Sequence, residues 1–154
     1  MIEIYTDGSC LKNPGGPGGY AVVVVEDEEI VNILGGSSPN TTNNRMEIEA
    51  IICAYKNYGT LSRTNQPIVY SDSSYCVNTF TNWVFRWADN GWTKADGFPP
   101  ENLDLMKKYY SIWEQGYFMD LRKVKGHVGI KFNEKADEVA KYNALNQPTQ
   151  DLKN

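Results

Sequence analysis

Hydrophobic and polar side chains alternate at the start of the chain, from Ile2 to Asp7. A period of two predicts a β-strand, which we expect to continue toward Cys10. Residues 20–25 and 30–34 are rich in β-branched side chains and are separated by the acidic stretch 26–29, a spacing that suits a β-hairpin. The pattern therefore predicts three consecutive antiparallel strands.

The pattern changes to a helical period between Asn44 and Tyr58, and Gly59 supplies a stop signal. A short apolar strand follows at residues 68–70, and the polar stretch Ser71–Ser74 offers caps for another helix. A strand, a helix and a strand joined at these distances predict a parallel strand pair with the connecting helix on one face of the sheet.

The remainder of the chain predicts three further helices, the first of them short, and one strand. Residues 83–98 are aromatic and rich in turn formers, so we expect a short helix and a loop there. Residues 103–115 have the pattern of an amphipathic helix, and residues 119–124 that of a last strand. After a loop at residues 126–132, Asn133 is expected to cap the final helix. Small apolar residues form a narrow stripe on that helix: Ala136, Val139, Ala140 and Ala144.

The composition is that of an ordinary globular protein, with 154 residues, 41% hydrophobic and 22% charged. This size predicts a single domain over residues 1–147, followed by a short flexible tail at 148–154. The longest apolar run, residues 20–25, is far shorter than the roughly 20 residues of a membrane span. Three cysteines without CxxC spacing favour reduced thiols. We therefore expect a cytoplasmic protein that is not bound to a membrane.

Charge is distributed unevenly along the chain. The net charge of −4 disfavours a protein that binds nucleic acid through a diffuse positive field. Between residues 121 and 141, however, six lysines and arginines face three acidic residues. The overall charge thus conceals a basic C-terminal third.

Four acidic residues fall where the predicted fold would gather a ligand. Asp7 and Asp72 lie at the ends of two strands predicted to be parallel, and ligands bind in the crevice at such carboxyl ends. Glu47 and Asp137 lie in the first turns of two predicted helices, which could aim both at the same edge. Carboxylates without a histidine or cysteine partner suit Mg²⁺ or Mn²⁺ rather than Zn²⁺. Acids at these positions also serve as caps or interact with helix dipoles, so spacing alone leaves both interpretations open.

The single histidine, His127, stands in the Gly-flanked segment 126–129. A histidine in a loop is usually only solvated. An imidazole with an ordinary pKa of about 6.5 can nevertheless transfer protons at neutral pH.

A series of short motifs runs in order from Tyr5 to Ala144, nearly the whole chain. It comprises Tyr5-Thr6-Asp7-Gly8-Ser9-Cys10, Asn13-Pro14-Gly15, Gly18-Gly19-Tyr20, Thr41-Thr42-Asn43-Asn44-Arg45-Met46-Glu47, Ser71-Asp72-Ser73, Tyr75, Trp83, Gly91-Trp92, Val124-Lys125-Gly126-His127-Val128-Gly129, Asn133-Glu134 and Ala136-Asp137-Glu138-Val139-Ala140. Each motif is weak alone, but the series is specific, and it resembles ribonuclease H of type 1. The resemblance implies an α/β fold with a five-stranded mixed sheet, three antiparallel strands followed by two parallel ones, and helices on both faces.

The resemblance also implies an activity and a set of site residues. The activity is hydrolysis of the RNA strand of an RNA-DNA hybrid by an endonuclease, leaving 5′-phosphate and 3′-hydroxyl ends. Two Mg²⁺ ions, with Mn²⁺ as a possible substitute, would be held by Asp7, Glu47, Asp72 and Asp137, while His127 assists. Residues implied in hybrid binding are Cys10, Asn13, Thr42, Asn43, Asn44, Ser74 and Trp83. We expect a monomer whose partner is the hybrid duplex.

The segment 83–100 corresponds to a protrusion that contacts the DNA strand in many bacterial members of the family. That protrusion is rich in lysine and arginine, whereas this chain has only Arg86 and Lys94 there. We therefore expect hybrid binding that depends weakly on salt. The aromatic spacing favours packing for Trp83 and Trp87, and leaves the role of Trp92 open.

Three other functions compete with this hypothesis. A binding module without catalysis would have lost at least one motif acid, and all four are present. A resolvase or transposase core would lack the string from Asn43 to Glu47. A hydrolase using Cys76 or Ser74 with His127 would lack a nucleophile elbow and a clear third partner.

Overall fold

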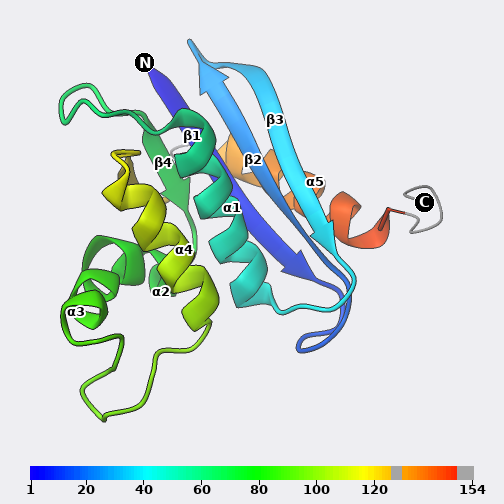
Figure 1. The fold of residues 1–154 in the computed structure, drawn as a ribbon. Helices are drawn as coiled ribbons and strands as arrows, with labels where there is room; N and C mark the ends of the chain where they lie inside the picture. The colour runs from blue at the N-terminus through cyan, green and yellow to red at the C-terminus, as the bar shows by residue number, and fades with distance from the viewer. Residues whose placement is uncertain (126–129, 149–154) are drawn as a thin grey trace.

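The computed structural model describes residues 1–125 and 130–148, and its centre is a single five-stranded sheet (Figure 1). The strands lie in the order β3-β2-β1-β4-β5. β1 pairs antiparallel with β2 and parallel with β4, β2 pairs antiparallel with β3, and β4 pairs parallel with β5. The strand bounds are β1 Ile2–Cys10, β2 Gly18–Glu26, β3 Glu29–Ser38, β4 Ile68–Ser71 and β5 Asp120–Lys123.

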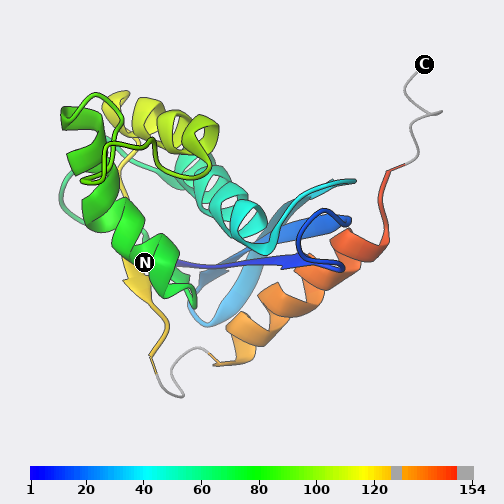
Figure 2. The same ribbon diagram turned by 90° about the horizontal axis from the view of Figure 1, so that it is seen from below.

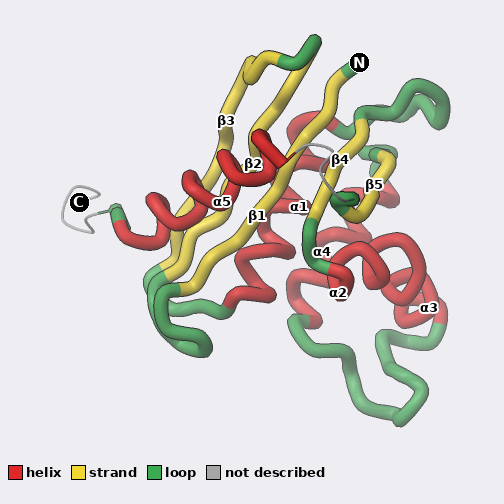
Figure 3. The backbone as a smooth tube through the Cα atoms, turned by 180° about the vertical axis from the view of Figure 1, so that it is seen from behind, coloured by secondary structure: helices red, strands yellow, loops and turns green. Residues whose placement is uncertain are grey.

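Helices cover both faces of this sheet. α1 packs on β1 and β2 from one side, with α4 against it, and α5 packs on the same two strands from the other side (Figure 2). The view from behind shows α5 crossing the sheet (Figure 3). The helix bounds are α1 Asn43–Tyr58, α2 Ser74–Asn78, the π-turn η1 Thr79–Trp83, α3 Val84–Asp89, α4 Leu103–Glu114 and α5 Ile130–Leu145. The expected α/β architecture is confirmed.

Alternation along the strands divides the core into two layers. Ile4 and Val22 are buried on the α1 side of the sheet, whereas Tyr5 and Val23, their neighbours in sequence, are buried on the α5 side. Successive side chains of a strand point to opposite faces. β2 is apolar along most of its length because helices cover it on both faces. The predicted alanine stripe of α5 packs against Gly19, where a Cβ would collide with the backbone of the helix.

The β2–β3 hairpin closes more tightly than the acidic run suggested. Glu26 pairs with Glu29, which leaves a turn of two residues. Asp27 and Glu28 have φ values of 53° and 65°. Two positive φ values in a two-residue turn match the right-handed twist of the flanking strands.

The start of α5 differs from the sequence prediction. The helix begins at Ile130, so Asn133 lies within it and is not the cap. The Phe132 ring packs against the Tyr5 ring, with 5.5 Å between their centroids, and this contact favours the additional helical turn. Asp137 consequently lies about two turns into the helix instead of in its first turn.

The start of α1 also differs slightly. Thr42 is the N-cap, and its side chain accepts a hydrogen bond of 3.1 Å from the Arg45 N–H. Glu47 is therefore the fifth residue of the helix and lies just beyond the first turn. At the other end Gly59 stops the helix as expected. Within residues 1–125 and 130–148, no helix is both long and apolar enough to cross a bilayer.

Candidate metal centre

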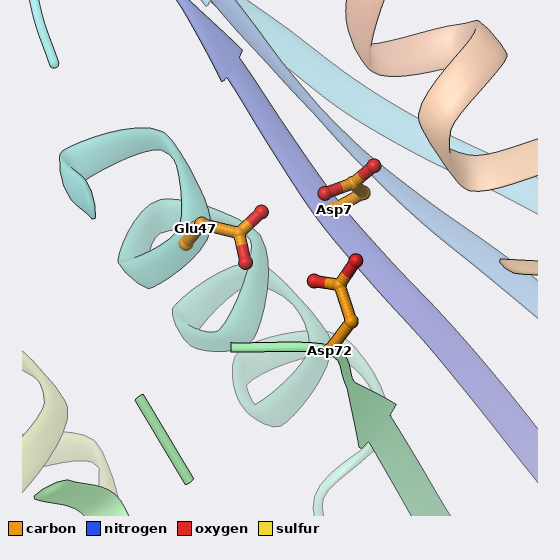
Figure 4. Close-up of side chains that lie close together, drawn as sticks. All are labelled: Asp7, Glu47 and Asp72. Atoms are coloured by element: carbon orange, nitrogen blue, oxygen red, sulfur yellow. The ribbon is translucent and has the colours of Figure 1, made fainter. Parts of the chain in front are cut away.

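Three carboxylates from distant parts of the chain meet at one edge of the sheet. Asp7 comes from β1, Glu47 from α1 and Asp72 from the residue that follows β4. One oxygen from each lies within 4.8 Å of the other two. The side chains point toward one another (Figure 4). The structure thus brings together three of the four acids that the sequence singled out.

The parallel pairing of β1 and β4 places two of these acids side by side. Tyr5 is level with Tyr70 in the register, so two residues further along each strand Asp7 and Asp72 reach the same edge. The Ser73 side chain caps α2 by accepting a hydrogen bond from the Cys76 N–H. Asp72 is therefore not the cap, and its exposed carboxylate faces the other acids.

Gly8 lets the third acid approach. A Cβ at this position would collide with the backbone of Met46 and Glu47, so only glycine allows α1 to pack this closely on β1. The Gly8 N–H donates to Asp7 Oδ1 at 2.9 Å and also to Glu47 Oε1. Reasoning from the sequence did not assign this role to Gly8. The available signal was a glycine directly after an acid within a strand, which often marks a close approach of backbone.

Burial makes the metal-free cluster electrostatically unfavourable. Asp7 and Glu47 are 7% and 8% exposed. Desolvation raises the pKa of Asp7 to about 6, and desolvation with the neighbouring carboxylates raises the pKa of Glu47 to about 10. Burial and mutual repulsion therefore favour a proton shared by this pair over two ionised carboxylates. A divalent cation would replace that proton and relieve the repulsion.

Asp137 lies beside this cluster without completing it. It is a hydrogen-bonding neighbour of Asp7 that contributes to the raised pKa of that carboxyl. Its own Oδ2 lies 3.0 Å from the Lys141 ammonium, one turn further along α5. The side chain of Asp137 is 48% exposed, whereas Asp7 and Glu47 are buried.

Five of the seven residues implied in hybrid binding form a polar rim near the same end of β1: Cys10, Asn13, Thr42, Asn43 and Asn44. Cys10 ends the strand, and the Asn13 side chain accepts a hydrogen bond of 3.1 Å from the Asn43 N–H. Asn43 and Asn44 are the first two residues of α1, after the N-cap Thr42. Their side chains are exposed and make no hydrogen bond to another described residue.

The structure describes Ser74 but not His127. Ser74 is exposed at the first position of α2, two residues after Asp72. His127 lies outside the described residues. The alternative nucleophile Cys76 is fully buried, and burial raises the pKa of its thiol to about 12. A buried neutral thiol is a poor nucleophile, which disfavours the cysteine hydrolase.

An open cavity of about 550 Å³ lies on the protrusion formed by α3 and the loop after it. Trp83 and Trp87 line it together with Arg86 and Lys94. The expected packing is confirmed for Trp87, which lies against the core, whereas Trp83 contacts Trp87 but stays 37% exposed. Trp92, whose role was open, packs edge-on against Tyr110 with 5.6 Å between centroids.

Comparison with known sequences gives a consistent family assignment. The RNase H family model matches residues 1–145. Ribonuclease H of Caldanaerobacter subterraneus subsp. tengcongensis is 41% identical over 141 residues, which cover 91% of this chain and 88% of that protein. Ribonuclease H of Haemophilus influenzae is 40% identical over 154 residues, covering 99% of this chain and 95% of that protein.

Solved structures share the fold. LC9-RNase H1, described as a type 1 RNase H with the type 2 active-site motif, is 32% identical with a TM-score of 0.73, covering 97% of this chain and 74% of that one. The PFV RNase H domain superposes with a TM-score of 0.80 at 22% identity, covering 94% of both chains. LC11-RNase H1, solved in complex with an RNA/DNA hybrid, has a TM-score of 0.69 at 23% identity, covering 94% of this chain and 96% of that one.

Proposed function

Because the chain belongs to the RNase H family, we propose that it hydrolyses the RNA strand of RNA-DNA hybrids as an endonuclease, leaving 5′-phosphate and 3′-hydroxyl ends. The observation that carries the proposal is the meeting of Asp7, Glu47 and Asp72 within 4.8 Å, at positions far apart in sequence. Gathering like charges in this way costs stability unless a function requires it. We also propose that residues 1–147 act as a single domain.

The donor set fits a pair of hard divalent cations. Carboxylate oxygens are the ligands of Mg²⁺ and Mn²⁺, and the raised pKa values of Asp7 and Glu47 are those of a site that lacks positive charge. Asp7, Glu47 and Asp72 would hold the ions, with Asp137 as the fourth ligand. When bound, two such ions supply an activated water and neutralise the charge on the departing oxygen.

The residues of the chain have distinct tasks in this chemistry. The Gly8 N–H fixes Asp7 Oδ1 and Glu47 Oε1, so two ligands are oriented before any ion arrives. The proton shared by Asp7 and Glu47 would leave when the site is filled, because a cation would stabilise the ionised carboxylates. Asp72 is the exposed member of the cluster, so it is the acid that a phosphodiester would meet first from solvent.

The residues of the polar rim would recognise the RNA strand. A 2′-hydroxyl distinguishes RNA from DNA, and it is accessible in the wide, shallow minor groove of an A-like duplex. Asn43 and Asn44 can both donate and accept hydrogen bonds without adding charge, and their side chains are exposed. With Cys10, Asn13 and Ser74 they would contact the RNA strand, while Thr42 and Asn13 would lie near a phosphate of the DNA strand and Trp83 further along it.

His127 has a supporting task in the proposal. Its imidazole would assist proton transfer or departure of the product, because it can exchange a proton at neutral pH. It is therefore an auxiliary residue, and the carboxylates carry the main part of the rate enhancement.

The decisive experiment compares three substrates with one purified chain. Labelled RNA-DNA hybrid, duplex RNA and duplex DNA are incubated with Mg²⁺ or with a chelator, and the product ends are identified. We expect cleavage of the hybrid alone, only with the cation, and only in its RNA strand. A matched pair of variants completes the test: Asp7→Asn should abolish cleavage, whereas Asp27→Asn, the same change in the exposed hairpin turn, should not. Hybrid that is bound but never cleaved would instead favour a binding module without catalysis.

A further inference from the structure

Lys141 makes the ion pair that links the acidic site to a positive charge. Its ammonium lies 3.0 Å from Asp137 Oδ2, four residues apart on one face of α5. Four other ion pairs join described residues, and none of them includes Asp7, Glu47, Asp72 or Asp137. In the described part of the chain, Lys141 is therefore the one side chain in salt-bridge contact with the acids of the site.

A pair of this kind has little effect on stability in itself. Both side chains are about half exposed, at 61% and 48%, and exposed pairs at i and i+4 of a helix contribute only about 0.3–0.5 kcal/mol. Its importance lies in the partner, because Asp137 is also a neighbour of Asp7. An ammonium there lowers the negative charge that a cation would meet, and it occupies an oxygen that would otherwise be available as a ligand.

We propose that Lys141 is a positioning residue that competes with a divalent cation for the Asp137 carboxylate and thereby weakens divalent-cation binding. This inference rests on the proposed function, since it needs the acids to be metal ligands. The ammonium and the cation compete for the same carboxylate. When the site fills, the Lys141 ammonium therefore has to leave Asp137 and move into solvent. Its long, exposed side chain allows that release at small cost.

The size of the effect follows from charge and exposure. A unit positive charge near a doubly charged ion is repelled in proportion to both charges, and solvent and salt screen the repulsion within about 10 Å. For a pair that is half exposed, we expect removal of the ammonium to tighten Mg²⁺ binding by about two- to fivefold at low salt.

The test measures Mg²⁺ binding directly, by titration calorimetry of the full chain without substrate. Lys141→Met removes the charge and keeps a good helix former of similar length. Lys135→Met is the matched control, because Lys135 lies on the same helix and pairs with Glu138 at 3.7 Å instead of with an acid of the site. Lys141→Arg retains the charge. Thermal unfolding of each metal-free variant verifies that the fold is intact.

We expect tighter binding in Lys141→Met, and wild-type affinity in both Lys135→Met and Lys141→Arg. The advantage of Lys141→Met should shrink as salt is raised, because screening weakens the repulsion. Equal affinity in Lys141→Met and Lys135→Met would overturn the inference, as would weaker binding in Lys141→Met, which would mean that Lys141 orients Asp137 as a ligand. A wild-type chain that binds no Mg²⁺ would instead remove the proposed function itself.

Discussion

Replacement of Asp7 by asparagine should abolish catalysis and stabilise the metal-free fold. The side chain is 7% exposed and faces two other carboxylates, so its ionised form is costly in the folded state. Asparagine has the same shape, and its Oδ1 can still accept the hydrogen bond from the Gly8 N–H. The substitution thus removes a buried charge and leaves the local geometry in place.

The magnitude follows from the raised pKa of Asp7. Burial raises this pKa from 3.8 to about 6, and such a rise corresponds to roughly 3 kcal/mol. The hydrogen bond between Asp7 and Glu47 is altered by the substitution, which offsets part of this gain. We expect a net stabilisation on the order of 1–3 kcal/mol, or roughly 3–10 °C in Tm for a chain of this size.

The stabilisation by Asp7→Asn should depend on pH. A carboxyl with a raised pKa binds more protons in the folded state than in the unfolded state between about pH 4 and pH 6, so the free energy of unfolding falls as pH rises through that window. Metal-free wild type should consequently lose stability from pH 4 to pH 7, and the advantage of Asp7→Asn should be small at pH 4 and complete above pH 6.

Thermal unfolding with a chelator, at pH 4, 5.5 and 7.5, measures this advantage, with Asp27→Asn as the control for loss of one surface charge. Addition of Mg²⁺ at pH 7.5 should raise the Tm of the wild type and leave that of Asp7→Asn unchanged. Destabilisation by Asp7→Asn at pH 7.5, or an advantage that does not vary with pH, would refute the argument that buried like charges dominate this site.

Three further predictions concern other parts of the molecule. Gly8→Ala should lower the Tm and hybrid cleavage together, because a Cβ there collides with the backbone of α1; unfolding and cleavage assays check this, and an unchanged enzyme would show that α1 can move aside. His127→Ala should slow turnover without abolishing it, and complete inactivity in steady-state assays would contradict an auxiliary role. Hybrid affinity should fall with a shallow slope as salt rises, since the protrusion has few basic residues and Lys94 is paired with Asp96 at 3.6 Å. A steep slope in a binding titration would show that the basic C-terminal third contacts the hybrid instead.

Local pattern predicted most of the fold because each element follows from neighbouring residues. The alternation at the start of the chain, the apolar run of β2 and the helical period ending at Gly59 all correspond to observed elements. The predicted start of α5 was wrong. Asn133 has a good capping side chain, but contact between Phe132 and Tyr5 favours an earlier start of the helix. A contact between residues so far apart in sequence leaves no local signal.

The candidate site also depends partly on local sequence and partly on contacts between distant residues. The residue types and positions of Asp7, Glu47 and Asp72 left metal binding and capping open, and the resemblance of the motif series to ribonuclease H favoured a hard-cation site at one edge of the sheet. Their mutual distance, the role of Gly8 and the pairing of Asp137 with Lys141 depend on how β1, α1 and α5 pack, and those contacts join segments that are remote along the chain. Sequence determines which groups are present, whereas burial and proximity, which set their pKa values and their affinity for a cation, arise only when the chain has folded.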